Sequence, residues 1–205
     1  MKGVSNDLRT KVAREAANLL YFGIEKEYKQ AKQKAAKTFG VKFLPTNLEV
    51  AKELDKIAEE IEGKSRDERL IQRRKEALKL MEILKSYKPI LVGSVWRGTA
   101  HRQSDIDVIV YNDESKIIVK SLEQNSFNIT KTEWVDITEQ GRKATSFHIY
   151  CESSNGEKFE VIVRSPEEAH RKVKCDIYGD EITGLSLQEL KKLLKENPTQ
   201  RFVPP

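Results

Sequence analysis

The chain has 205 residues, of which 38% are hydrophobic and 34% are charged, and it carries a formal net charge of +5. This length suits one domain, or one domain with a helical extension. No apolar run approaches the roughly 20 residues of a membrane-spanning helix, and no signal-like apolar segment opens the chain. We therefore expect a cytoplasmic protein with no membrane partner. The basic charge is compatible with an anionic partner such as a nucleotide or RNA.

The beginning of the chain carries the pattern of a long helix. From Asp7 to Phe39 apolar residues recur at steps of three and four, with hardly a helix breaker among them. This spacing predicts one amphipathic helix of unusual length, stopped by Gly40. A glycine in its middle, Gly23, is expected to bend the helix without ending it.

Two further helices are predicted by capping boxes at residues 46–49 and 65–68, the first of them ended by Gly63. Lysine and arginine are frequent in the helices, above all at residues 29–37 and 66–75. Such stretches indicate either a solvated face with paired charges or a surface that follows the phosphates of RNA or DNA. No series of aromatic residues is interleaved with these charges to support the second interpretation.

The segment that organises the rest of the chain is Gly93–Tyr111, with the sequence GSVWRGTAHRQSDIDVIVY. A short apolar run breaks at Gly93 and Ser94, where a glycine lets backbone N–H groups approach phosphate oxygens. Asp105 and Asp107 lead directly into a β-branched run, and the alternation of a strand places both carboxylates on one face. Neighbouring carboxylates repel each other unless a cation lies between them, and hard oxygen ligands suit Mg²⁺.

Beyond this segment the pattern changes from helices to strands. A turn and a short helix are expected within residues 112–124, and short turns then join three strands, which makes these strands antiparallel neighbours. A further strand through Ile177 and a last helix capped at Ser186 follow. The fold class is therefore α/β (α+β), a mixed and largely antiparallel sheet behind an N-terminal helical region. The three strands cover residues 127–137, 144–151 and 159–163, and the expected domains are residues 1–87 and 88–205.

The Gly-Ser pair at residues 93–94, the Arg-Gly pair at 97–98 and the Ser-Asp-Ile-Asp run at 104–107 resemble the signature of the nucleotidyltransferase superfamily. That superfamily includes the DNA polymerase beta type, the archaeal CCA-adding enzymes and the minimal nucleotidyltransferases. The whole chain most resembles an archaeal group of predicted nucleotidyltransferases. The resemblance implies a two-metal site of Mg²⁺, with Mn²⁺ as an alternative, in which Asp105 and Asp107 are ligands.

The resemblance also implies a third carboxylate on the last of the antiparallel strands after the signature. Glu160 lies on that strand, in the opposite phase to the apolar Phe159, Val161 and Val163. The stretch is similar to the corresponding strand of the archaeal CCA-adding enzymes, which has an aspartate between apolar residues, so the glutamate departs from the pattern. Asp136 on a neighbouring strand is the alternative third ligand, and an exposed structural glutamate without a role in the site also stays open.

Several other residues are candidates for contacts with the nucleotide. Ser94 offers its hydroxyl and backbone N–H to phosphate. Arg97 either touches the triphosphate or braces the signature loop by pairing with an acidic residue such as Asp105. Lys172 and Lys174 follow the Glu160 strand, in a place where the superfamily often binds triphosphate or base.

The remaining reactive side chains are expected to have no role in the site. His101 lies in a connecting loop and is expected to be solvated, although it could reach a nucleotide. His148 alternates within a strand and is expected to be packed. Cys151 and Cys175 form neither a disulfide framework nor a metal-binding spacing, so we expect reduced thiols.

These residues predict Mg²⁺-dependent transfer of a nucleoside monophosphate from an NTP, such as ATP, to a hydroxyl, with release of pyrophosphate. Asp105 and Asp107 would hold both metal ions, and Glu160 would hold one and help to align the attacking hydroxyl. The acceptor stays open among RNA, a protein side chain and a small molecule, as do the preferred base and the oligomeric state. The alternative is a non-catalytic nucleotide- or RNA-binding module, or an antitoxin-like partner protein, on the same fold.

Overall fold

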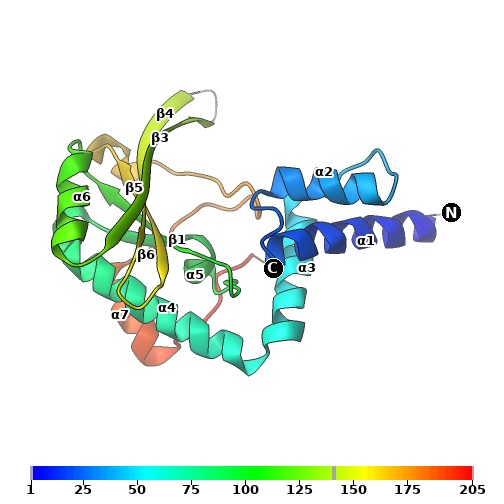
Figure 1. The fold of residues 1–205 in the computed structure, drawn as a ribbon, viewed down its shortest axis with the longest axis horizontal. Coiled ribbons are helices and arrows are strands. Elements are labelled where there is room, and N and C mark those ends of the chain that lie inside the picture. Colours follow the sequence, from blue (N-terminus) through cyan, green and yellow to red (C-terminus); the bar gives the residue numbers. More distant parts are fainter. Residues whose placement is uncertain (1, 140–141, 205) are drawn as a thin grey trace.

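A six-stranded sheet organises the C-terminal half of the chain (Figure 1). The structure is a computed structural model that describes residues 2–139 and 142–204. The order β3-β4-β5-β2-β1-β6 contains one parallel pair, β2 with β5, and antiparallel pairs elsewhere, which confirms the expected mixed sheet. The strands are β1 (Ile90–Val92), β2 (Ile106–Tyr111), β3 (Asn128–Glu139), β4 (Arg142–Glu152), β5 (Lys158–Arg164) and β6 (Leu185–Ser186).

Seven α-helices are found among the described residues, and none of them is long and apolar enough to cross a membrane. Four of them, α4, α5, α6 and α7, bury apolar residues in one cluster with the sheet. Short 3₁₀ turns follow α4 at Lys85–Tyr87 and β5 at Pro166–His170. The α-helices are α1 (Lys2–Tyr21), α2 (Tyr28–Thr38), α3 (Asn47–Glu62), α4 (Lys64–Ile83), α5 (Gly93–Arg97), α6 (Ser115–Gln124) and α7 (Leu187–Glu196).

The expected long helix is instead a hairpin of two helices, α1 and α2, so the prediction of a simple bend was wrong. Gly23 adopts a φ of +68°, which ends α1. Its N–H donates to the carbonyl of Leu20, and the N–H of Ile24 donates to the carbonyl of Leu19. This pair of bonds is a Schellman motif, a helix-ending arrangement that glycine favours because it lacks Cβ. The chain therefore reverses at residues 22–27 before α2 begins.

The two predicted capping boxes have different outcomes. Thr46 and Glu49 exchange the expected hydrogen bonds at the start of α3. Ser65 caps nothing, because its hydroxyl donates to the carbonyl of Glu62 and α4 has already begun at Lys64. Gly63, with a φ of +50°, separates the two helices so sharply that no loop is left for a side-chain cap.

Two separate hydrophobic clusters divide the chain. One lies among α1, α2 and α3, and the other joins the sheet to α4, α5, α6 and α7. Because Leu70, Leu80 and Met81 of α4 belong to the second cluster, we propose a boundary near Gly63 rather than at residue 87. We call residues 2–62 the helical region and residues 64–204, where the candidate catalytic residues are expected, the catalytic region.

Three arginines of the basic stretch on α4 are buried and therefore do not belong to a solvated face. Arg66, Arg73 and Arg74 are buried, with 4%, 6% and 0% of their surfaces exposed. Arg74 donates four hydrogen bonds to backbone carbonyls, those of Val95 and Trp96 in α5 and of two residues near the C-terminus. These arginines therefore hold loops of the catalytic region against α4.

The segment between β5 and α7 was also predicted incorrectly. Among the described residues, the region around Ile177 contains an isolated bridge between Lys174 and Glu181 and no named strand. The sheet is instead completed by β6, which pairs with β1. Ser186 and Glu189 form the expected capping box at the start of α7.

Candidate active site

The turn after β1 brings the backbone against a carboxylate. Gly93 has a φ of +69°, and a Cβ at this position would lie 1.8 Å from Oδ2 of Asp107. Any larger residue would displace that carboxylate or the turn, which explains the glycine. Ser94 follows at the start of α5, and both residues line a cleft at this end of the sheet.

Strand register brings the expected carboxylates together. Asp107 on β2 and Glu160 on β5 are direct partners in the parallel pair. Asp105 lies two residues before Asp107, and the buried Ile106 and Val108 alternate with them on the opposite face. Three carboxylates therefore share one face of the sheet.

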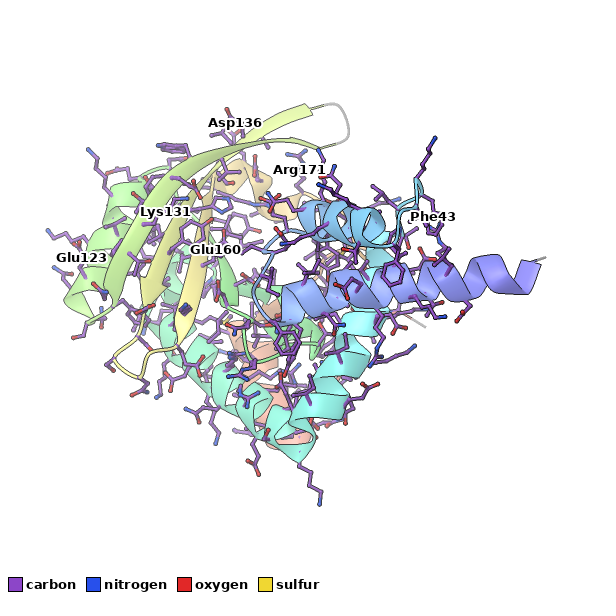
Figure 2. The ribbon with its side chains drawn as sticks, turned by 45° about the vertical axis from the view of Figure 1, so that its right-hand side comes forward. Phe43, Glu123, Lys131, Asp136, Glu160 and Arg171 are labelled. Carbon is purple, nitrogen blue, oxygen red and sulfur yellow. The ribbon has the colours of Figure 1, made fainter. Side chains whose placement is uncertain are left out.

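Asp136 lies on the other face. It pairs with Thr145 in the register of β3 and β4, and the Thr145 hydroxyl donates to its Oδ1 at 2.7 Å. Three residues earlier on β3, Glu133 pairs with His148 and therefore occupies the face of Glu160. Figure 2 shows Asp136 near the free end of the β3–β4 hairpin, away from Glu160. This placement favours Glu160 over Asp136 as the third carboxylate.

The proximity of these carboxylates changes how readily they ionise. Burial at the floor of the cleft raises the pKa of Asp107 well above its usual value, and the charges of Glu160 and Asp105 raise it further. Burial also raises the pKa of Asp105, which the positive charge of Lys158 partly opposes. The site therefore concentrates negative charge that a cation would relieve.

Glu160 is held by the neighbouring strand. Its Oε1 lies 2.5 Å from Nδ1 of His148, and Nε2 of His148 lies 2.8 Å from the hydroxyl of Ser146. Burial and then the charge of Glu160 raise the pKa of Tyr150, the direct partner of Glu160 on β4. His148 is thus packed as expected, but it also contacts the candidate third ligand.

The donor set fits a hard divalent cation, because it consists of carboxylate oxygens that repel one another. Asp105 and Asp107 would hold the metal directly. Among the described residues no three His, Cys, Asp or Glu side chains are arranged as a complete metal site, and Glu160 contacts His148 instead. Glu160 therefore completes the site only by turning part of its carboxylate towards the aspartates.

The cleft in front of the carboxylates has a volume of about 620 Å³. Lys158, at the start of β5, and Lys26, in the link between α1 and α2, contribute positive charge to its lining. His101 also lines it, with a ring centroid 5.7 Å from that of Tyr21, and burial lowers the His101 pKa to about 4. The expectation of a solvated His101 was wrong, since the helical region covers it.

Arg97 pairs with an acid outside the signature. Its guanidinium makes two hydrogen bonds to Asp180, at 2.7 and 3.1 Å, and donates to the carbonyl of Phe202. The rings of Trp96 and Tyr178 lie 4.5 and 4.6 Å from its central carbon. Arg97 therefore braces the loop by pairing with an acidic residue, as one alternative expected, and that residue is Asp180 rather than Asp105.

Lys172 and Lys174 lie outside the cleft. Lys172 is an exposed residue that forms an ion pair with Glu181 at 3.0 Å, and Lys174 bridges the backbone of the same residue. The lysines that do line the cleft, Lys26 and Lys158, have no motif around them. Lys158 could have been found from its position two residues before Glu160, on the same strand face.

A family model of the nucleotidyltransferase domain matches residues 68–179, more than half of the chain, so the chain belongs to this family. The match contains the Gly-Ser turn and all three carboxylates. It does not include α1, α2 or α3.

The chain is also similar, at low levels, to several solved structures. One is Cid1 in complex with the UTP analogue UMPNPP, with a TM-score of 0.36 and 18% identity over 57% of this chain and 37% of that chain. Another is a cytoplasmic RNA terminal U-transferase, with a TM-score of 0.33 and 19% identity over 55% and 35%. A third is the GLD-2/RNP-8 complex, with a TM-score of 0.32 and 12% identity over 51% and 34%.

The chain spans about a third of the length of these structures. A search of curated proteins gave no match. The family assignment therefore rests on the nucleotidyltransferase domain, and neither an archaeal grouping nor a relation to the CCA-adding enzymes is shown.

Proposed function

We propose that the protein transfers a nucleoside monophosphate from an NTP to a hydroxyl acceptor in a metal-dependent reaction and releases pyrophosphate. The observation that carries this proposal is the register of Asp107 with Glu160, on the same face as Asp105 and against the Gly93 turn. The family assignment supports the same chemistry.

The residues take distinct roles in this proposal. Asp105 and Asp107 bind Mg²⁺ or Mn²⁺, which neutralises charge on the phosphates when it is bound. Gly93 and Ser94 offer backbone and hydroxyl groups to the triphosphate. Glu160 aligns the attacking hydroxyl, since it extends from the strand beside Asp107.

The test uses the purified chain with Mg²⁺, each of four α-labelled NTPs, and acceptors that include RNA with a free 3′ hydroxyl and protein. We expect transfer and pyrophosphate release with the wild type. Asp107→Asn should lower turnover by about a thousandfold or more, because the metal ion that neutralises the phosphate charge loses a ligand. Glu160→Gln should lower turnover steeply, and Glu160→Asp should retain activity.

Asp136→Asn is the matched control. It changes a carboxylate on the opposite face of the same sheet and should leave turnover unchanged. Loss of activity in this variant together with full activity of Glu160→Gln would show that Asp136, and not Glu160, is the third carboxylate.

A second candidate function is a nucleotide- or RNA-binding module without turnover. The contact of Glu160 with His148 favours it, because the third carboxylate is engaged elsewhere. Binding of NTP or RNA with no transfer to any acceptor in the same screen would support this candidate and contradict the enzyme.

A further inference from the structure

The cleft in front of the carboxylates is built by both regions of the chain. Its volume of about 620 Å³ lies within the range of roughly 300–1,000 Å³ typical of small-molecule sites. Gly93, Ser94 and the two aspartates form one wall. The α1–α2 link, the first residue of α2, and α3 form much of the wall opposite, and Figure 1 shows this link on the side of the helical region that faces the sheet.

One end of the helical wall is positively charged. Lys26 lines the cleft together with Asp105 and Asp107. The neighbouring Glu25 is already paired with Lys34 at 2.8 Å. Among the described residues Lys26 has no carboxylate within ion-pair distance. Its ammonium group is therefore available to an anion held in front of the aspartates.

The other end of the helical wall is aromatic and apolar. Tyr28 and Leu54 come from the helical region, and Tyr178 and Ile177 come from the loop after β5. Burial raises the pKa of Tyr28, and the nearby Tyr178 raises it further. The two tyrosines therefore lie close together across this end. Such a surface suits the flat, partly apolar face of a nucleobase and its ribose.

Polar contacts fix the two walls to each other. Asp55 of α3 accepts hydrogen bonds from Arg66 and Arg201, each at 2.5 Å. Asn47, at the start of α3, donates to the carbonyl of Asp176 in the loop that also contains Tyr178. The helical wall is thus held in place by the same loop that closes the apolar end.

We propose that the helical region supplies the second wall of a nucleoside triphosphate site, in which Lys26 contacts the triphosphate and Tyr28 contacts the nucleoside. This proposal rests on the proposed function, since it takes the NTP as the ligand of the cleft. It extends that function to a region outside the nucleotidyltransferase domain match. The charged end then lies beside the carboxylates, and the apolar end lies where the nucleoside must extend.

Calorimetric titrations of the full chain test the two ends separately. The probes are ATP and UTP with Mg²⁺, inorganic tripolyphosphate with Mg²⁺, and adenosine. Lys26→Ala should raise the Kd for the NTPs and for tripolyphosphate by about tenfold, the loss of one charge-assisted contact. It should leave adenosine binding unchanged. Tyr28→Leu, which keeps an apolar side chain in the helical core, should weaken NTPs and adenosine and leave tripolyphosphate unchanged.

Lys37→Ala is the matched control, because it removes the same charge from an exposed position farther along α2. It should leave every Kd unchanged. An unchanged Kd for NTP and tripolyphosphate in Lys26→Ala would overturn the assignment of the helical wall. The proposed function would survive that result if Asp107→Asn still abolished transfer. A wild-type chain that bound none of the probes would overturn both proposals.

Discussion

The helical and catalytic regions are stabilised by different kinds of core. Among the described residues of the helical cluster, seven of the 13 buried positions are alanine. In the cluster of the catalytic region, two of 22 are alanine, and the rest are larger, including Trp96, Phe159 and Met81. Smaller side chains let helices approach closely but bury less apolar surface per residue, so hydrophobic stabilisation is weaker in the helical region.

The difference shows how each region tolerates charge. The catalytic region buries Arg74 and Arg97 and holds the half-buried Asp107 beside a large core that offsets their desolvation. Apart from Glu53, which is buried and pairs with Arg14 and Lys56, the described charged residues of the helical region lie at its surface or at its junction with the rest of the chain. We infer that the helical region depends on that polar junction, whereas the catalytic region depends on its own core.

The largest expected effect comes from breaking the core of the catalytic region at Arg74. Its guanidinium satisfies four backbone carbonyls, and burial lowers its pKa to about 10. Arg74→Met should leave these carbonyls unsatisfied and lower the free energy of unfolding by roughly 3 kcal/mol or more. Chemical denaturation measures the change. Lys75→Met removes the same charge from the next, exposed residue and should have little effect, so equal losses would contradict the role of Arg74.

The next effect should separate the two regions. Asp55 links α3 to Arg66 and Arg201 of the catalytic region. Asp55→Ala should cost about 2 kcal/mol, because Arg66 then remains buried with one partner fewer. Hydrogen exchange should become faster in α1, α2 and α3 and stay unchanged in β2 and β5.

Glu60→Ala serves as the control for this variant. Glu60 is also on α3, but it pairs with Arg14 within the helical region. Its loss should leave hydrogen exchange across the junction unchanged. If hydrogen exchange in Asp55→Ala became equally faster in both regions, the two regions would unfold as one cooperative unit. That result would contradict the inference that the helical region alone depends on the polar junction.

The extent to which the sequence predicts the molecule also differs between the regions. Strand phase was enough to place Asp105, Asp107 and Glu160 on one face, because alternation in a strand is a local property. The Schellman ending at Gly23 had a local signal too, an apolar residue directly after the glycine, which was overlooked.

Long-range contacts could not be predicted in this way. Arg97 meets Asp180, 83 residues away, and no pattern in the sequence connects the two. Arg74 lies in a stretch whose composition indicates a solvated face, and only the packing of α5 and the C-terminus against α4 reveals its burial. Lys26 reaches the cleft because the helical region folds back over the catalytic one.

A smaller effect is expected at the contact that holds the third carboxylate of the catalytic region. His148→Phe removes the Nδ1 contact with Glu160 and should lower kcat by about tenfold, with KM for NTP changed less than about twofold. His148→Asn should restore part of kcat, because its amide nitrogen can occupy the position of Nδ1. His170→Phe, at an exposed position, is the control. An unchanged or raised kcat in His148→Phe would show that His148 does not position Glu160.

The smallest expected effect is the change in stability when the charge of Asp107 is removed, and it tests how well the catalytic region tolerates charge. Burial, and then the charges of Glu160 and Asp105, raise the pKa of Asp107 in the folded chain. The ionised carboxylate therefore destabilises the fold, and this destabilisation reaches its full size at pH values above the raised pKa. Without metal, Asp107→Asn should therefore stabilise the chain by about 1 kcal/mol, or about 3 °C in Tm for a chain of this size. The gain should grow between pH 5 and pH 8 and shrink when Mg²⁺ stabilises the wild type. Asp136→Asn should change Tm at neither pH. A lower Tm of Asp107→Asn in EDTA at pH 8 would show that the three carboxylates do not strain the fold, and that the catalytic region tolerates this charge without a cation.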